Sequence, residues 1–132
     1  MIVTALCDSY KAEIIAGVHA VDDEYRLALY SPEANLDRST AFYSANGEVT
    51  GEGYDAGGIV LAGASVRSIN GAACLAFDSV EWPRTTISAA GGAIYNASKQ
   101  NRTVAVFNFG EVVQTRNGRF SVKIPAQLIG IK

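Results

Sequence analysis

Three Asn-Gly dipeptides interrupt this chain, and they constrain its fold more than any other sequence feature. They occur at Asn46-Gly47, Asn70-Gly71 and Asn117-Gly118, each between stretches with strand-forming residues. Asn and Gly tolerate positive φ values, which a two-residue type I′ turn requires at both of its central positions. Because such turns join antiparallel strands, the repeated dipeptide favours an antiparallel β-sheet.

Alternating hydrophobic residues flank two of these turns. The best predicted hairpin joins 112–115 to 119–124, since Phe120, Val122 and Ile124 alternate with polar residues on the second strand. The next best joins 65–69 to 72–77 through Asn70-Gly71. Short strands with such turns at intervals of roughly 8–12 residues are typical of sandwiches and barrels.

Three further segments are predicted as strands. Segment 25–30 alternates, with Tyr25, Leu27 and Leu29 on one face. Segment 102–109 is apolar on both faces, which predicts a central strand that is covered on both sides. Segment 128–131 is expected to end the chain as a short strand.

Before residue 20, the spacing of apolar residues predicts a helix over about 4–16. The apolar stripe consists of Tyr10, Ile14 and Val18, with Cys7 and Ile15 beside them. Asp8 or Ser9 could cap this helix, and Gly17 could end it. The alternative is a strand over 1–6 followed by a shorter helix.

The fold class expected from these patterns is all-β: an antiparallel β-sandwich or jelly-roll-like barrel with one short N-terminal α-helix. At 132 residues the chain is expected to form a single domain, 1–132. We assign 1–20 to the N-terminal helical segment and 21–132 to the β-sandwich. Polar segment 31–40 is predicted as a long exposed loop.

Composition excludes several classes of protein. The chain is 48% hydrophobic and 18% charged with a formal net charge of −2, which excludes a disordered chain. It is also not basic enough for bulk electrostatic attraction to nucleic acid, so we do not expect nucleic acid as a partner. No apolar run approaches the length of a membrane span, and no signal peptide is recognisable, so we expect the chain to start in a cytoplasm with no membrane partner.

The chain contains few residues of the types that commonly act in catalysis. His19 is the only histidine, and we interpret it as a structural residue near the helix C-terminus. Cys7 and Cys74 are interpreted as buried reduced thiols, with a disulfide between them as the alternative. The acidic triplet 22–24 is interpreted as a solvated turn, and Gly-rich segment 51–58 as backbone turns. We therefore predict no enzyme activity, no catalytic residues, no metal site and no cofactor.

Read in order, the residues resemble a family of small virion structural proteins of tailed bacteriophages. The matching segments are Glu24–Tyr30, Asn46–Gly58, Ala76–Trp82, Thr85–Asn96, Ala105–Gly110 and Phe120–Pro125. The Gly-Tyr-x-x-Gly-Gly and Phe-Asp-x-x-x-Trp pieces are the most recognisable, and the match covers most of the chain. The chain departs from the pattern at Ala90-Gly91, where a basic residue is expected in relatives.

The resemblance implies a virion structural protein, most simply a capsid decoration (cement) protein that binds the capsid shell through protein–protein contacts. Its partners would be the major capsid protein or other virion proteins, and it would form a homo-oligomer, located in the virion after assembly in the host cytoplasm. Alternatives are a neck, tail or fibre-base component, or a carbohydrate-binding β-sandwich module. The candidate interface residues are Phe42, Tyr43 and Tyr54, whereas Trp82 and Tyr95 are expected in the core. A sugar-binding platform would need exposed rings from Tyr30, Tyr43, Tyr54 and Trp82.

Overall fold

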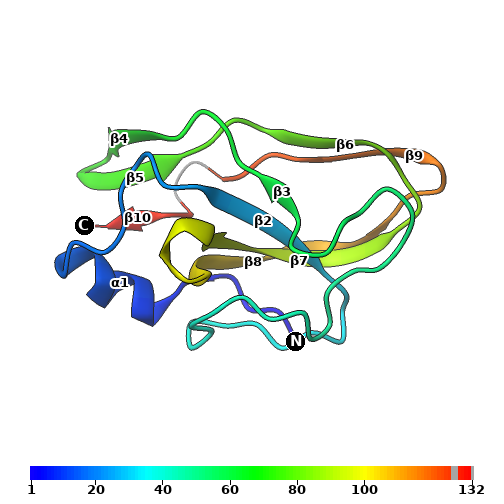
Figure 1. The fold of residues 1–132 in the computed structure, drawn as a ribbon, viewed down its shortest axis with the longest axis horizontal. Helices are drawn as coiled ribbons and strands as arrows, with labels where there is room; N and C mark the ends of the chain where they lie inside the picture. Colours follow the sequence, from blue (N-terminus) through cyan, green and yellow to red (C-terminus); the bar gives the residue numbers. More distant parts are fainter. Residues whose placement is uncertain (126–127, 132) are drawn as a thin grey trace.

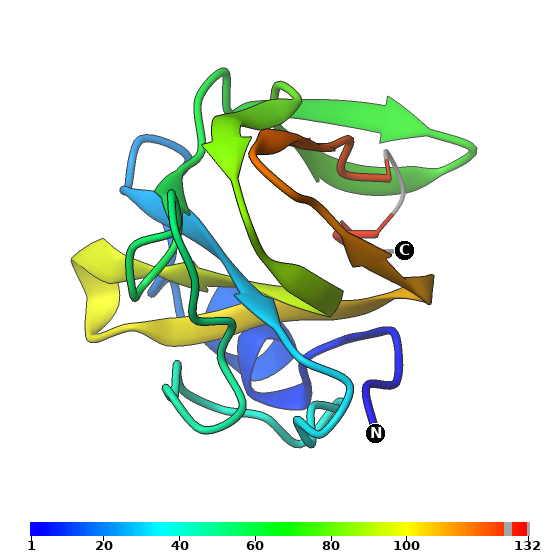
Figure 2. The same ribbon diagram turned by 90° about the vertical axis from the view of Figure 1, so that its right-hand side faces the viewer.

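The computed structural model describes residues 1–125 and 128–131, and it shows two layers of β-sheet with further chain packed beneath them. One layer is a five-stranded sheet that runs through the middle of the molecule (Figure 1). Figure 2 shows the second layer lying across it. The predicted all-β sandwich with one short N-terminal helix is therefore confirmed.

The elements follow one another along the chain in a simple order. They are β1 (Ala5–Leu6), α1 (Asp8–Ile15), β2 (Tyr25–Tyr30), β3 (Ile59–Val60), β4 (Ser65–Ile69), β5 (Ala72–Ala76), β6 (Val80–Thr85), β7 (Ser88–Asn96), the 3-10 helix η1 (Ala97–Lys99), β8 (Arg102–Gln114), β9 (Gly118–Val122) and β10 (Gly130–Ile131).

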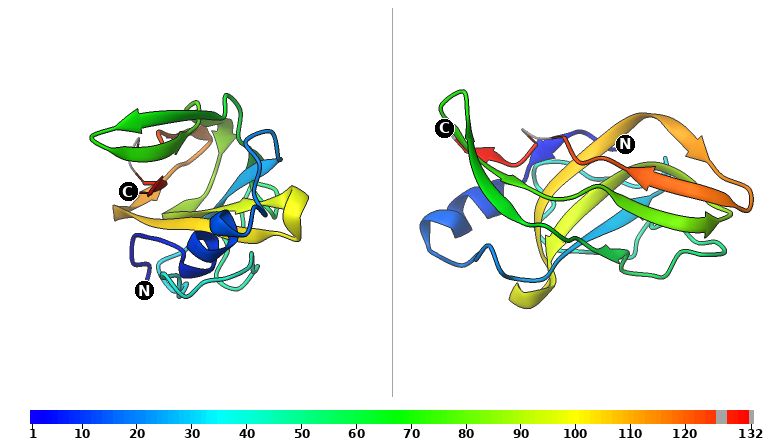
Figure 3. Two further views of the ribbon diagram at one scale, coloured as in Figure 1. Left: turned by 90° about the vertical axis from the view of Figure 1, so that its left-hand side faces the viewer. Right: turned by 90° about the horizontal axis from the view of Figure 1, so that it is seen from above.

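The five-stranded sheet has the order β1-β8-β7-β2-β3, with antiparallel neighbours throughout. Residues 104–107 of β8 are buried on both faces, as predicted for a strand that is covered on both sides. Helix α1 and segment 31–50 lie against one face of this sheet, opposite the second layer (Figure 3). The N-terminal helix thus packs on the sheet of its own chain and contributes Tyr10 to its hydrophobic core.

The second layer contains two smaller groups of strands. One has the order β10-β5-β4, and the other is the pair β6-β9. Alternating residues of β9 and the segment after it face inward, so that Phe120, Val122 and Ile124 are buried as predicted.

The Asn-Gly turns have different outcomes. Asn70-Gly71 joins β4 to β5 in the predicted hairpin, and both residues have positive φ. The predicted hairpin around Asn117-Gly118 is wrong, because β8 pairs with β7 while β9 pairs with β6. Asn117 does have positive φ, but the turn carries the chain from one layer to the other. Pairing partners of strands are set by tertiary packing, which a local turn signal does not encode.

The helical prediction over 4–16 is too long. A short strand, β1, precedes an eight-residue helix, which matches the alternative of strand followed by helix. Cys7 is the N-cap and makes no side-chain cap hydrogen bond, so neither Asp8 nor Ser9 caps the helix. The chain leaves the helix at Gly17, which has the positive φ expected of a helix stop. Ile15 does not join the buried stripe, since it is 90% exposed.

Both cysteines are buried and unpaired, which confirms the interpretation as reduced thiols and not as a disulfide. Burial raises the pKa of the Cys7 thiol to about 11, although a hydrogen bond with Thr103 partly opposes the shift.

The Gly-rich segment 51–58 consists of turns and close approaches, as interpreted from the sequence. Gly58 has a φ of +83°, and a Cβ at this position would lie 1.9 Å from the carbonyl oxygen of Leu27. Only glycine lets the segment reach β2 at that point. Gly71 also has positive φ, at +80°, but a Cβ there would meet nothing within 4 Å.

These two glycines separate the cost of backbone strain from the cost of a steric clash. We expect Gly71→Ala to lower the free energy of unfolding by about 1–2 kcal/mol, the usual cost of a left-handed residue with a side chain. We expect Gly58→Ala to cost about 3 kcal/mol or more, because β2 or segment 51–58 must move. Urea unfolding of both variants measures the difference, and equal losses would contradict this account.

Candidate functional site

A carboxylate and three tyrosine hydroxyls organise the segment that carries the predicted interface residues. Glu48 accepts hydrogen bonds from the hydroxyls of Tyr43 and Tyr54, each at 2.5 Å, and from the Gly57 backbone N–H at 2.8 Å. The Tyr95 hydroxyl donates to the carbonyl of Gly57. Apart from Tyr95, which lies in β7, these groups come from segments that are not strands, and the hydrogen bonds hold these segments together and to the sheet.

Tyr54 lies in the interior and presents no surface to a partner. It is 7% exposed, and its hydroxyl oxygen also accepts a hydrogen bond from the Leu29 backbone N–H at 3.0 Å. Burial, together with the bond to Glu48, raises the pKa of Tyr54 above its ordinary value. Its ring packs against Trp82 with a centroid distance of 6.0 Å.

Other aromatic residues are buried in the same way. Trp82 is 6% exposed and Tyr95 3% exposed, which confirms the expectation that both lie in the core. Tyr30 is 1% exposed, and its hydroxyl donates to the carbonyl of Ser44. Three of the four rings that a sugar-binding platform would need are therefore inside the protein.

Phe42 and Tyr43 behave differently from Tyr54. Phe42 is 51% exposed, and the Arg102 guanidinium carbon lies 5.6 Å from its ring centroid, in a cation–π arrangement. Tyr43 is half-buried and stacks on Tyr95 with a centroid distance of 4.7 Å. Of the three predicted interface residues, Phe42 is thus the one that offers most of a ring to solvent.

The arginine beneath Phe42 belongs to an ion-pair network that fixes it in place. Arg102 donates to Glu13 at 2.9 Å, and the other oxygen of Glu13 lies 2.8 Å from Nε2 of His19. The amide nitrogen of Asn96 lies 2.9 Å from Nδ1 of His19. Because the Asn96 amide can only donate through this nitrogen, Nδ1 is the acceptor and Nε2–H the donor. His19 is structural, as expected, but it binds Glu13 and not the last carbonyls of the helix.

Asp23 extends this network on the other side of Asn96. Its carboxylate accepts from the Asn96 amide at 2.8 Å, from Lys99 at 2.8 Å and from the Ala20 backbone N–H at 3.0 Å. Burial raises the pKa of Asp23, but these hydrogen bonds and the charge of Lys99 outweigh it and lower the pKa to about 2. Asp23 therefore joins the segment after α1 to η1, whereas the sequence placed its acidic triplet in a solvated turn.

The basic residues of the C-terminal third are mostly neutralised. Lys99 pairs with Asp23, Arg102 with Glu13, and Arg119 with Glu81.

Within residues 1–125 and 128–131, no group of three or more His, Cys, Asp or Glu side chains is placed to hold a metal ion. No helix in this part of the chain is long and apolar enough to cross a membrane.

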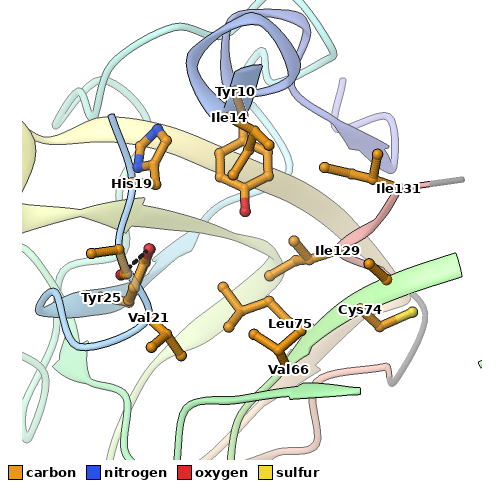
Figure 4. A pocket seen from close by; sticks show the side chains of 12 residues that line it. Tyr10, Ile14, His19, Val21, Tyr25, Val66, Cys74, Leu75, Ile129 and Ile131 are labelled. Carbon is orange, nitrogen blue, oxygen red and sulfur yellow. Dashed lines mark hydrogen bonds between the residues drawn. The ribbon is translucent and has the colours of Figure 1, made fainter. Parts of the chain in front are cut away.

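A pocket of about 190 Å³ opens between α1, the segment that follows it, β5 and the end of the chain (Figure 4). Its walls are mainly aliphatic, with Ile14, Leu75 and Ile129 among them. Tyr10 projects from α1, and its hydroxyl points into the space between these side chains (Figure 4). Burial raises the pKa of Tyr10 to about 12.

Sequence reasoning did not find this pocket or the Glu48 cluster. In the sequence, Tyr10 was identified only as part of an apolar stripe. Its position on that stripe does not indicate which residues of other segments pack against it. The side chains opposite its hydroxyl, Leu75 of β5 and Ile129 of the C-terminal segment, are more than 60 residues away in the chain. Glu48 was the one residue with a usable sequence signal, since it closely precedes the Gly-rich segment, from which it binds the Gly57 N–H and the Tyr54 hydroxyl.

Comparison with known proteins yields no relative: no family model matches the chain, and neither curated proteins nor solved structures give a match.

The lowered pKa of Asp23 predicts how the network responds to acid. An aspartate has a pKa of about 3.9 in an unfolded chain, and the folded value is about 2. The contribution of Asp23 to stability is therefore complete above about pH 5 and is lost as the pH falls through 4 to 2. We expect Asp23→Asn to unfold more easily than the wild type at pH 5, with a difference that shrinks towards pH 2.

The measurement is urea unfolding at several pH values between 5 and 2. Asp22→Asn is the matched control, because it removes the neighbouring, exposed carboxylate. A difference between Asp23→Asn and the wild type that does not change over this pH range would contradict the assignment.

Proposed function

We propose that this protein is a structural component of a tailed-phage particle, most simply a capsid decoration protein. It binds the capsid shell through protein–protein contacts and carries out no chemistry. In this proposal the protein acts in the virion as a homo-oligomer. Such assemblies are closed and symmetric or dock on a repeating lattice, so that one small surface is used many times.

The observation that carries the proposal is the exposure of the Phe42 side chain to solvent. Phe42 is about half exposed, and Arg102, which is itself bound to Glu13, lies against its ring. The backbone around Phe42 is also tied to the start of β8 by a bridge to Arg102. An exposed aromatic ring buries a large apolar area when a partner covers it, and aromatic residues are enriched in protein interfaces.

The resemblance of successive segments to small virion proteins supports a phage particle as the partner. The segments that resemble small virion proteins include Glu24–Tyr30 and Asn46–Gly58. In the structure these segments form β2 and the Glu48 cluster, which hold the loop that carries Phe42. Tyr30 and Glu48 of these segments hydrogen-bond to Ser44 and Tyr43, beside Phe42 in the same loop.

The number of copies in each particle tests the proposed location. We expect quantitative mass spectrometry of purified virions to find hundreds of copies, since a decoration protein repeats with the shell lattice. About six or twelve copies would place the protein at the neck, tail or a fibre base instead, and its absence from virions would overturn the proposal altogether.

Substitution of the exposed ring tests the proposed contact. We expect Phe42→Ala to weaken binding to shells assembled without this protein by about tenfold or more, because an interface anchor contributes upwards of about 1.4 kcal/mol. Val66→Ala is the control, since Val66 is 66% exposed on β4 in the other layer. Co-sedimentation with shells measures both, and equal binding of the two variants would remove Phe42 from the interface.

A further inference from the structure

The pocket beneath α1 combines an apolar lining with a hydroxyl that is left without a partner. Tyr10 is 3% exposed, and within residues 1–125 and 128–131 its hydroxyl makes no hydrogen bond. The other five tyrosines each donate one, including Tyr25 in the same pocket, whose hydroxyl bonds to the carbonyl of Ala20 at 2.8 Å. The residue is buried as a whole, but its hydroxyl oxygen is reached from the open side of the pocket and is therefore available to a molecule that enters it.

The position of the Tyr10 hydroxyl suits it to contact such a molecule. Figure 4 shows the Tyr10 oxygen directed into the open centre of the pocket, towards Leu75 and Ile129, and not into a wall. A group placed in that space would meet one hydrogen-bond donor surrounded by aliphatic side chains. Binding pockets for small molecules commonly show this pattern, in which a mostly apolar lining fixes affinity and a single polar group fixes orientation.

The volume and charge of the pocket restrict the ligand. A dry cavity of about 150 Å³ accommodates benzene, and this pocket measures about 190 Å³. It therefore suits a molecule of roughly six to nine non-hydrogen atoms. No Lys, Arg, Asp or Glu lies among the described lining residues, and the ring nitrogens of His19 are bonded to Glu13 and Asn96. An ionised ligand would lose its hydration without gaining a counter-charge, so a neutral one is favoured.

We propose that this pocket binds a small, neutral, apolar molecule with one carbonyl group, and that the carbonyl oxygen accepts a hydrogen bond from the Tyr10 hydroxyl. This site is separate from the proposed contact at Phe42 and does not depend on it.

Two probes of similar shape test the proposal: acetophenone, which has a carbonyl, and ethylbenzene, which has none. Each is titrated into the full-length protein while amide NMR shifts are recorded. We expect saturable shifts at pocket residues such as Leu75 and Ile129 below about 5 mM, since ligands of this size bind weakly. Acetophenone should bind more tightly than ethylbenzene. No saturable shift with either probe would overturn the proposal.

Matched hydroxyl deletions test the role of Tyr10. We expect Tyr10→Phe to weaken acetophenone binding roughly three- to tenfold, the effect of one neutral hydrogen bond, and to leave ethylbenzene binding unchanged. Tyr25→Phe removes a hydroxyl that is already bonded to Ala20 and should preserve the preference for the ketone. If Tyr10→Phe keeps the wild-type ratio of the two affinities, or Tyr25→Phe loses it equally, the proposed hydrogen bond is wrong. The dispersion of the NMR spectrum reports whether each variant is folded.

Discussion

Burial of the central sheet on both faces is the constraint on which the rest of the structure depends. Strand β7 is buried along almost its whole length, and residues 104–107 of β8 are buried too. The second β-layer covers one face, but the opposite face is covered by α1 and by chain without regular structure. Such chain has no continuous ladder, so its backbone groups are satisfied by isolated backbone hydrogen bonds, such as that from the Ser31 N–H to the Gly47 carbonyl, and by side chains.

Side-chain hydrogen bonds fulfil that requirement at several places. The Thr103 hydroxyl donates to the carbonyl of Thr40, and the Asn108 amide donates to the carbonyl of Ile2. Glu48 collects two tyrosine hydroxyls and a backbone N–H from the segments around it. The network from Arg102 through Glu13 and His19 to Asn96 joins the helix to the sheet. These contacts explain why polar residues are buried at positions where periodicity alone would predict hydrophobic ones.

The same contacts also determine what the protein can present to its surroundings. The tyrosines that hydrogen-bond to the covering chain, among them Tyr30, Tyr54 and Tyr95, are buried. The neighbouring aromatic residue Phe42 is instead 51% exposed. Tyr10 is the opposite exception, since it is buried but its hydroxyl holds no covering segment. Helix α1 links the two features, because Glu13 supports the arginine beneath Phe42 while Tyr10 faces the pocket. One short helix thus supports both the exposed ring of Phe42 and one wall of the pocket.

The sequence by itself determined the local elements of this protein. Strand β2 and the β4–β5 hairpin lie where alternation and the Asn70-Gly71 turn predicted them, because side-chain period and positive φ are properties of neighbouring residues. Only the tertiary structure decided that β9 pairs with β6, that Tyr54 is buried, and that a pocket faces Tyr10. Each of these depends on contacts between residues far apart in the chain, and such contacts are selected by the packing of the whole core rather than by local spacing.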